Sequence, residues 1–195
     1  MKKRLLSIIF ILNLLISNSI ALEPDIFVQS TVNRASKLLS EDISKDEKIE
    51  KLKQIAKDTV DIKGIGFYTL GAARKNLNED QKKEYSQKFE KYFLKSFASR
   101  LAEYTNPEID VFAKEILNKN YTIVNSTLKA TKERPEIKID WRIYTKNPDQ
   151  PLIRDLIIEG LSLARTQKEE FASVLSGNDG DIIALFKVLE EFSNK

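Results

Sequence analysis

Residues 135–171 contain the pattern that most restricts the fold of this chain. Apolar residues alternate with charged ones from Ile137 to Ile143, which is the period of a β-strand with one apolar face. The turn-forming residues KNPDQP follow, and residues 152–159 form a second run rich in leucine and isoleucine. Residues 135–159 therefore predict a β-hairpin. The second run has apolar residues at both parities, which predicts an interior strand covered on both faces.

A helix is expected directly after this hairpin. Gly160 and Ser162 end the strand and cap a helix, in which Leu163, Phe171 and Leu175 recur at close to helical spacing. A hairpin that feeds a helix folded back over the sheet leaves an apolar space between the two layers.

The first 21 residues have the three parts of a secretory signal peptide. Lys2, Lys3 and Arg4 form a positively charged start, residues 5–16 an apolar core, and residues 19–21 a small-x-small cleavage site. The apolar run is short for a transmembrane helix, and a retained N-terminal anchor is the alternative. Cleavage after Ala21 leaves residues 22–195, which predicts a soluble periplasmic protein without a lipid-bearing cysteine.

Composition argues against several classes of function. The signal peptide carries three of the 32 basic residues and none of the 29 acidic ones, so residues 22–195 have no formal net charge. This balance argues against nucleic-acid binding, for which a basic face is expected. The chain has no cysteine and no histidine, which removes the commonest general base and the commonest transition-metal ligand. We expect no enzymatic activity, no catalytic residues, no metal site and no cofactor.

Three amphipathic helices are expected before residue 105. Pro24 stands at a first helical position, and the pairs Ser44 with Glu47 and Asn78 with Gln81 have the spacing of capping boxes. The third helix carries an aromatic stripe, whose members are Tyr85, Phe89, Tyr92, Phe93, Phe97, Leu101 and Tyr104. A stripe of this kind usually forms core, and a helix that walls a cavity has the same pattern.

Residues 61–71, DIKGIGFYTLG, are almost uncharged and hold three of the six glycines. They match neither a phosphate-binding loop nor a dinucleotide fingerprint. Two interpretations remain open. Either small residues in a helix allow close approach of another element or a ligand, or the segment is ordinary core.

Strands follow the helices, which sets the fold class. Residues 109–112 and 121–131 predict strands before the hairpin, and residues 182–192 return to helix. This order predicts an α+β fold, with a four-stranded antiparallel sheet packed against several helices and an apolar cavity between sheet and helices. The fold would be NTF2-like or cone-like with an added helical part. We expect one domain over residues 22–195, with a helical part at about 22–105, the sheet at about 109–159 and C-terminal helices at about 162–193.

Two segments resemble one known family. Residues 70–104 contain a Leu-Gly pair, a spaced Gln, an aromatic-rich helix and a closing Tyr, and residues 154–171 contain Asp, then Glu-Gly-hydrophobic-Ser, then a polar helix. Both are similar to the MlaC family, the periplasmic phospholipid-binding components of the ABC transport system for outer-membrane lipid asymmetry, also linked to toluene tolerance. The matching positions are Leu70, Gly71, Tyr85, Phe89, Tyr104, Asp155, Glu159, Gly160 and Ser162. The sequence departs from the family pattern at Ala73, Pro151 and Arg154.

The resemblance implies a soluble carrier of phospholipid between two membrane complexes. These are an inner-membrane ABC transporter complex with a substrate-binding-domain component and an outer-membrane lipoprotein and porin complex. It also implies that acyl chains lie between sheet and helices, with the headgroup toward solvent. Each buried methylene contributes about 0.8 kcal/mol, so both chains must be sheltered by bulky apolar side chains. We expect phospholipid as cargo and a monomeric carrier.

The candidates for lining the lipid pocket come from three elements. They are Phe67 and Leu70 from the glycine-containing segment, Phe89, Phe93 and Phe97 from the aromatic helix, and Trp141, Ile143, Leu156 and Ile158 from the hairpin.

Two functions from other classes remain as alternatives. One is a periplasmic enzyme on an α+β cone scaffold that uses Asp155 or Glu159 as acid or base, two carboxylates whose spacing would place them on the same face of a strand. The other is a periplasmic holdase module, whose apolar surface binds polypeptide in place of lipid.

Overall fold

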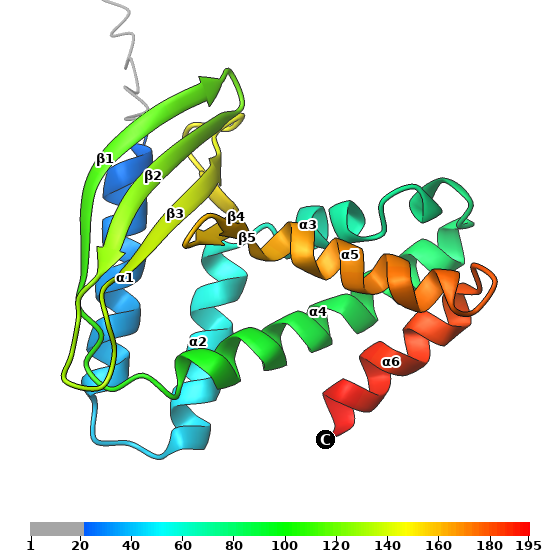
Figure 1. Ribbon diagram of the computed structural model, residues 1–195, viewed down its shortest axis with the longest axis horizontal. Helices are drawn as coiled ribbons and strands as arrows, with labels where there is room; N and C mark the ends of the chain where they lie inside the picture. Colours follow the sequence, from blue (N-terminus) through cyan, green and yellow to red (C-terminus); the bar gives the residue numbers. More distant parts are fainter. Residues whose placement is uncertain (1–21) are drawn as a thin grey trace, which may run out of the picture.

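The computed structural model describes residues 22–195, which form six α-helices and one antiparallel sheet (Figure 1). The predicted signal peptide lies outside the described residues. Along the chain the elements are α1 (Pro24–Ser40), α2 (Lys45–Thr59), α3 (Ile62–Thr69), the short 3-10 helix η1 (Ala73–Lys75), α4 (Glu79–Leu101), β1 (Ile109–Asn118), β2 (Tyr121–Leu128), β3 (Ile137–Tyr144), β4 (Leu152–Ile158), β5 (Leu161–Ser162), α5 (Leu163–Ser176) and α6 (Ile182–Asn194). The α+β class is confirmed. Among residues 22–195, no helix is long and apolar enough to cross a membrane.

The sheet has the strand order β1-β2-β3-β4-β5 and curls around α1 (Figure 1). It contains the four expected strands, and a fifth strand of two residues, β5, pairs with β4. β1 runs to Asn118, well beyond the predicted end at residue 112. Lys114 and Glu115 interrupt the apolar alternation there, and the strand lies at the edge of the sheet with two irregularities in its pairing. A largely exposed edge strand needs no regular apolar pattern.

β4 has an interior place in the strand order, between β3 and β5, as the sequence predicted for this run. This strand pairs with β3 along its length but with only two residues of β5. A register shift makes Arg154 an extra residue, so that Ile153 pairs with Ile143. Beyond the shift, Leu156 pairs with Trp141. Ile153 and Leu156 therefore share one face, although their spacing in the sequence places them on opposite faces of a regular strand.

Local capping signals fix the starts of the helices. Pro24 occupies the first turn of α1, and both expected capping boxes are present, Ser44 with Glu47 at α2 and Asn78 with Gln81 at α4. In each box the side chain of the first residue accepts a backbone N–H that would otherwise lack a partner. α1 buries one apolar face in the curve of the sheet, with Phe27, Val28 and Val32 among its buried residues (Figure 1).

The glycine-containing segment forms α3 and packs closely on α4. A Cβ added at Gly66 would lie 2.7 Å from Cδ1 of Phe89. The Gly66 carbonyl oxygen accepts hydrogen bonds from the Tyr85 hydroxyl at 3.1 Å and the Thr69 hydroxyl at 2.7 Å. Close approach of another element, the first of the two interpretations, is therefore confirmed for Gly66, which is itself buried.

The aromatic stripe of α4 forms the surface on which α5 and α6 pack. α4, α5 and α6 extend away from the sheet (Figure 1). The Phe89 ring meets Phe171 of α5 edge to face at 6.2 Å, and the Tyr92 ring lies 4.8 Å from Phe192 of α6. These centroid distances are in the range of favourable aromatic pairs. One face of α4 thus holds both later helices.

Candidate functional site

Two adjoining cavities lie between the sheet and the helices. The first, which we call the α1–α2 cavity, has a volume of about 140 Å³. Its wall is formed by α1, α2, the last turn of α4 and the inner face of the sheet, with Val32, Leu39, Leu52, Ile55, Ile139 and Ile158 among its lining residues. None of its lining residues is charged.

The second cavity, which we call the α4–α5 cavity, has a volume of about 230 Å³. Phe89, Phe93 and Ala164 contribute to its apolar wall. It also has charged lining residues, which are Arg100, Asp155 and Glu170. The two cavities share Phe97, Trp141, Ile153 and Leu156 as wall residues. They are therefore adjoining compartments, of which one is free of charge and the other has charged groups.

Six of the nine candidate lining residues border these cavities. Phe97, Trp141 and Leu156 border both, Phe89 and Phe93 border the α4–α5 cavity, and Ile158 borders the α1–α2 cavity. Phe67, Leu70 and Ile143 border neither. Leu70 and Ile143 are buried in the core, and Phe67 packs against the Tyr85 ring at a centroid distance of 6.4 Å.

The lining residues that sequence reasoning missed come mainly from α1 and α2. Val32, Leu39, Leu52 and Ile55 all line the α1–α2 cavity. Their helical spacing marks them as one apolar face, and that signal is the same for a solid core and for a cavity wall. Only the packing of the sheet against both helices shows that these side chains face a hollow.

Trp141 can stand in this apolar wall because its polar atom has a partner. Its Nε1–H donates to Oγ of Ser126 at 2.8 Å, and the Ser126 hydroxyl donates to the Ile139 carbonyl oxygen at 2.9 Å. Both residues are buried. An unpaired indole N–H would carry a desolvation cost, so Ser126 allows the ring to serve as an apolar surface.

Polar side chains of α4 and α5 gather at one edge of the α4–α5 cavity. We call this set, Ser96, Arg100, Thr166, Gln167 and Glu170, the α4–α5 rim. The Tyr92 hydroxyl donates to Oε1 of Gln167 at 2.7 Å, and Nε2 of Gln167 donates to Glu170 at 2.8 Å. Burial and, to a smaller extent, the charge of Glu170 raise the pKa of Tyr92, so this hydroxyl stays a donor.

Asp155 fastens β4 to the first turn of α5. Its carboxylate accepts the Ser162 hydroxyl at 2.6 Å and the Ala164 N–H at 3.0 Å, and Nη1 of Arg142 lies 3.6 Å away. The residue is only 4% exposed, so these partners compensate a buried charge at a helix N-terminus. The predicted pairing with Glu159 on one strand face is wrong. Glu159 follows the end of β4 at φ 49° and accepts the Lys138 N–H.

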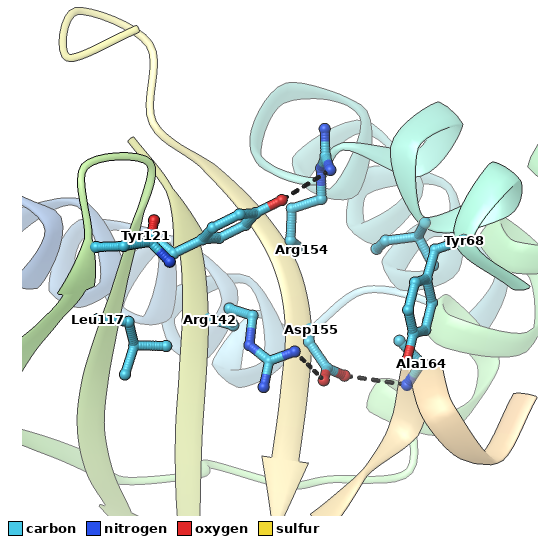
Figure 2. A pocket seen from close by; sticks show the side chains of 9 residues that line it. Tyr68, Leu117, Tyr121, Arg142, Arg154, Asp155 and Ala164 are labelled. Atoms are coloured by element: carbon cyan, nitrogen blue, oxygen red, sulfur yellow. Dashed lines mark hydrogen bonds and ion pairs between the residues drawn. The ribbon is translucent and has the colours of Figure 1, made fainter. Parts of the chain in front are cut away.

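A third cavity, of about 320 Å³, lies where Tyr121 and Arg142 project from the outer face of the sheet (Figure 2), and it shares Ile65, Asp155 and Ala164 with the α4–α5 cavity. Arg142 alternates along β3 with the inward residues Trp141 and Ile143, so it points to this outer face. Arg154 donates to the Tyr121 hydroxyl at 3.1 Å and pairs with Asp61 at 2.5 Å. Arg142 lies beside Asp155, but its buried Nε has no hydrogen-bond partner among residues 22–195, and apolar side chains such as Leu117 and Ile65 also line this cavity. The departure from the family pattern at Arg154 is thus accommodated by a local ion pair.

Residues 22–195 contain no group of three or more acidic side chains arranged to hold a metal ion.

Comparison with known proteins agrees with this architecture. The phospholipid-binding protein from Ralstonia solanacearum, solved in complex with a phospholipid, superposes with a TM-score of 0.74. It is 20% identical to this chain, and the match covers 89% of this chain and 98% of that one, which establishes a shared fold. No curated protein matches the chain at a significant level. The family model described as "MlaC protein" matches residues 29–191. The chain belongs to the MlaC family.

Proposed function

We propose that this protein is a soluble phospholipid carrier that shelters acyl chains in the two adjoining cavities. The observation that carries the proposal is the α1–α2 cavity, which has no charged lining residue and shares a wall with the α4–α5 cavity. Transfer of a methylene from water to such a space is favourable by about 0.8 kcal/mol. A bound phospholipid in a protein of the same fold supports this choice of ligand.

The chemistry of the cavities supports binding over catalysis. The chain contains neither histidine nor cysteine, and both oxygens of Asp155 accept hydrogen bonds from the start of α5. A carboxylate held in this way fastens β4 to the start of α5, which is a structural role. A carrier must release its phospholipid chemically unaltered, which requires a cavity without reactive groups.

Family membership and the N-terminal pattern support a finer proposal about where the carrier works. The protein is exported to the periplasm and collects phospholipid at one membrane complex for delivery at the other. The partners are an inner-membrane ABC transporter complex and an outer-membrane lipoprotein and porin complex. No nucleotide-binding motif is present in the sequence, so the energy for directed transport comes from the partner.

Mass spectrometry of solvent extracts from the purified protein tests lipid carriage. We expect phospholipid from the host in the wild-type protein and a marked loss in Leu156→Arg and Phe93→Asp, because each change puts a charge into an apolar wall. Matched controls are Ile183→Arg and Phe112→Asp, since these side chains are 45% and 66% exposed and line none of the three cavities.

Circular dichroism and the urea midpoint establish that each variant folds. Wild-type protein without extractable phospholipid would refute lipid carriage, and stable binding of unfolded polypeptide by that lipid-free protein would favour the holdase alternative. Equal phospholipid content in folded Leu156→Arg and in its control would place the lipid outside these cavities.

A further inference from the structure

We infer that the α4–α5 rim binds a zwitterionic phospholipid headgroup, with Arg100 on the phosphate and Glu170 on a primary ammonium group. This inference rests on the proposed function, since it concerns the headgroup of the proposed cargo.

The distribution of charge between the cavities orients the lipid. The α1–α2 cavity has no charged lining residue, whereas the α4–α5 cavity has Arg100 and Glu170 at exposed positions. Burial of an unpaired charge costs several kcal/mol. The acyl chains therefore extend past Trp141 and Leu156, which line both cavities, toward α1 and α2. The charged headgroup stays at the α4–α5 rim.

Arg100 has the chemistry and the freedom to bind the phosphate. It lies one turn after Ser96 on α4, and both residues line the same cavity. Its guanidinium group makes no ion pair and no hydrogen bond with any residue of the described range 22–195, whereas Lys88 on the same helix pairs with Glu190. Guanidinium binds phosphate through two parallel N–H donors, which gives stronger and better oriented contacts than a point charge.

Glu170 offers the complementary group from α5. Its carboxylate accepts a hydrogen bond from Gln167, and Gln167 is in turn held by the Tyr92 hydroxyl. Within residues 22–195 no cation pairs with Glu170, and no ion pair joins it to Arg100. Opposite charges therefore line one cavity without neutralising each other. A headgroup with both phosphate and ammonium offers an opposite charge to each, while an anionic headgroup that ends in glycerol offers no positive charge to Glu170.

The α4–α5 rim offers well-matched controls for an experiment. Arg165 and Glu169 lie on α5, are exposed and line none of the three cavities. Substitution of either by glutamine changes the net charge as Arg100→Gln and Glu170→Gln do. Any general effect of surface charge on vesicle encounter appears equally in the control.

The test loads delipidated protein from vesicles of equimolar phosphatidylethanolamine and phosphatidylglycerol and measures the bound lipids by mass spectrometry. Wild type should enrich phosphatidylethanolamine about twofold to fivefold over the vesicle, the range for exposed ion pairs. Glu170→Gln should abolish this enrichment, and Arg100→Gln should lower the uptake of both lipids by a similar factor. Arg165→Gln and Glu169→Gln should match wild type.

Two outcomes would overturn the inference, and they are distinguishable. Lipid-loaded wild type with no enrichment, or with enrichment unchanged in Glu170→Gln, would remove the headgroup assignment and leave lipid carriage intact. If the wild-type protein takes up neither lipid, both the headgroup assignment and the proposal of lipid carriage are refuted.

Discussion

Replacement of Gly66 by alanine tests how closely α3 is fitted against the wall of the α4–α5 cavity. The new Cβ would lie 2.7 Å from one Phe89 ring carbon and 3.2 Å from two others, well inside the optimal carbon–carbon separation of about 3.5–4.0 Å. The Phe89 ring is only 2% exposed and is stacked between Tyr85 at 5.7 Å and Phe93 at 6.1 Å. The ring can yield only by disturbing this stack.

The size of the effect follows from two opposing contributions. Overpacking of a well-filled core costs about 1–3 kcal/mol, and the upper half of that range applies because a backbone shift would also strain the hydrogen bonds from Tyr85 and Thr69 to the Gly66 carbonyl. Alanine in a helix is favoured over glycine by about 1 kcal/mol. We therefore expect a net loss of about 1–2 kcal/mol in the free energy of unfolding. For a chain of this length this lowers the Tm by about 2–8 °C.

Urea denaturation with a parallel measurement of bound phospholipid is the assay. Gly177→Ala is the control, because an added Cβ there would meet nothing closer than 3.4 Å and the residue has an ordinary helical φ of −73°. We expect the control to change stability by less than about 0.5 kcal/mol. Phe89 borders the α4–α5 cavity, so Gly66→Ala should also reduce lipid content. Equal stability of Gly66→Ala and Gly177→Ala would refute the close packing of α3 on Phe89.

Two further predictions concern the buried carboxylate and the pH dependence of folding. Asp155→Asn removes the charge beside Arg142 and one acceptor for the first turn of α5, so urea midpoints should show a loss of about 2–3 kcal/mol. Asp179→Asn, in an exposed turn at φ 54°, should be close to neutral, and an equal effect of the two changes would contradict the role given to Asp155. Hydrogen bonds from Lys114 and Arg34 hold the pKa values of Asp25 and Asp58 below their usual range. A carboxyl group with a lowered folded-state pKa contributes stability above its unfolded pKa and loses it as the pH falls through the folded value. Urea titrations should therefore show constant stability from about pH 7 to 5, since there is no histidine, and a decline below about pH 4; a step between about pH 5.5 and 7 would be inconsistent with this account.

The beginnings of the helices were predictable because their signals are local. Ser44 and Glu47 are three residues apart, and their two hydrogen bonds form within one turn. Ser162 likewise caps α5 by accepting the Arg165 N–H. Such contacts need no distant partner, so they can be inferred from adjacent residues alone.

The strands were predictable where one face is apolar and not elsewhere. The alternation over residues 137–143 corresponds directly to β3. The bulge at Arg154 in β4 could not be predicted from the sequence. A bulge changes the face of the sheet on which a side chain lies without changing the composition of the strand. The separation of Glu159 from Asp155 has a similar cause, since the end of a strand is set by its pairing partner.

The lining residues of the candidate site were likewise predictable only in part. The aromatic stripe of α4 supplied Phe89, Phe93 and Phe97, which do border cavities, but the same reasoning chose Leu70 and Ile143, which are buried in core that borders neither cavity. Whether a side chain is apolar can be read from the sequence. Whether it borders a cavity depends on how several helices and strands pack against one another.

The class of the protein could be inferred from local features: helices, then strands, then helices, no histidine or cysteine, and a family pattern spread over the chain. Which apolar residues face a cavity became clear from the packing of the domain. Leu52 of α2 and Leu156 of β4 are distant in sequence, yet they line one space. The packing also places Arg100 and Glu170 on the same rim. The physical reason is that a cavity is bounded by segments whose relative positions depend on the packing of the whole domain.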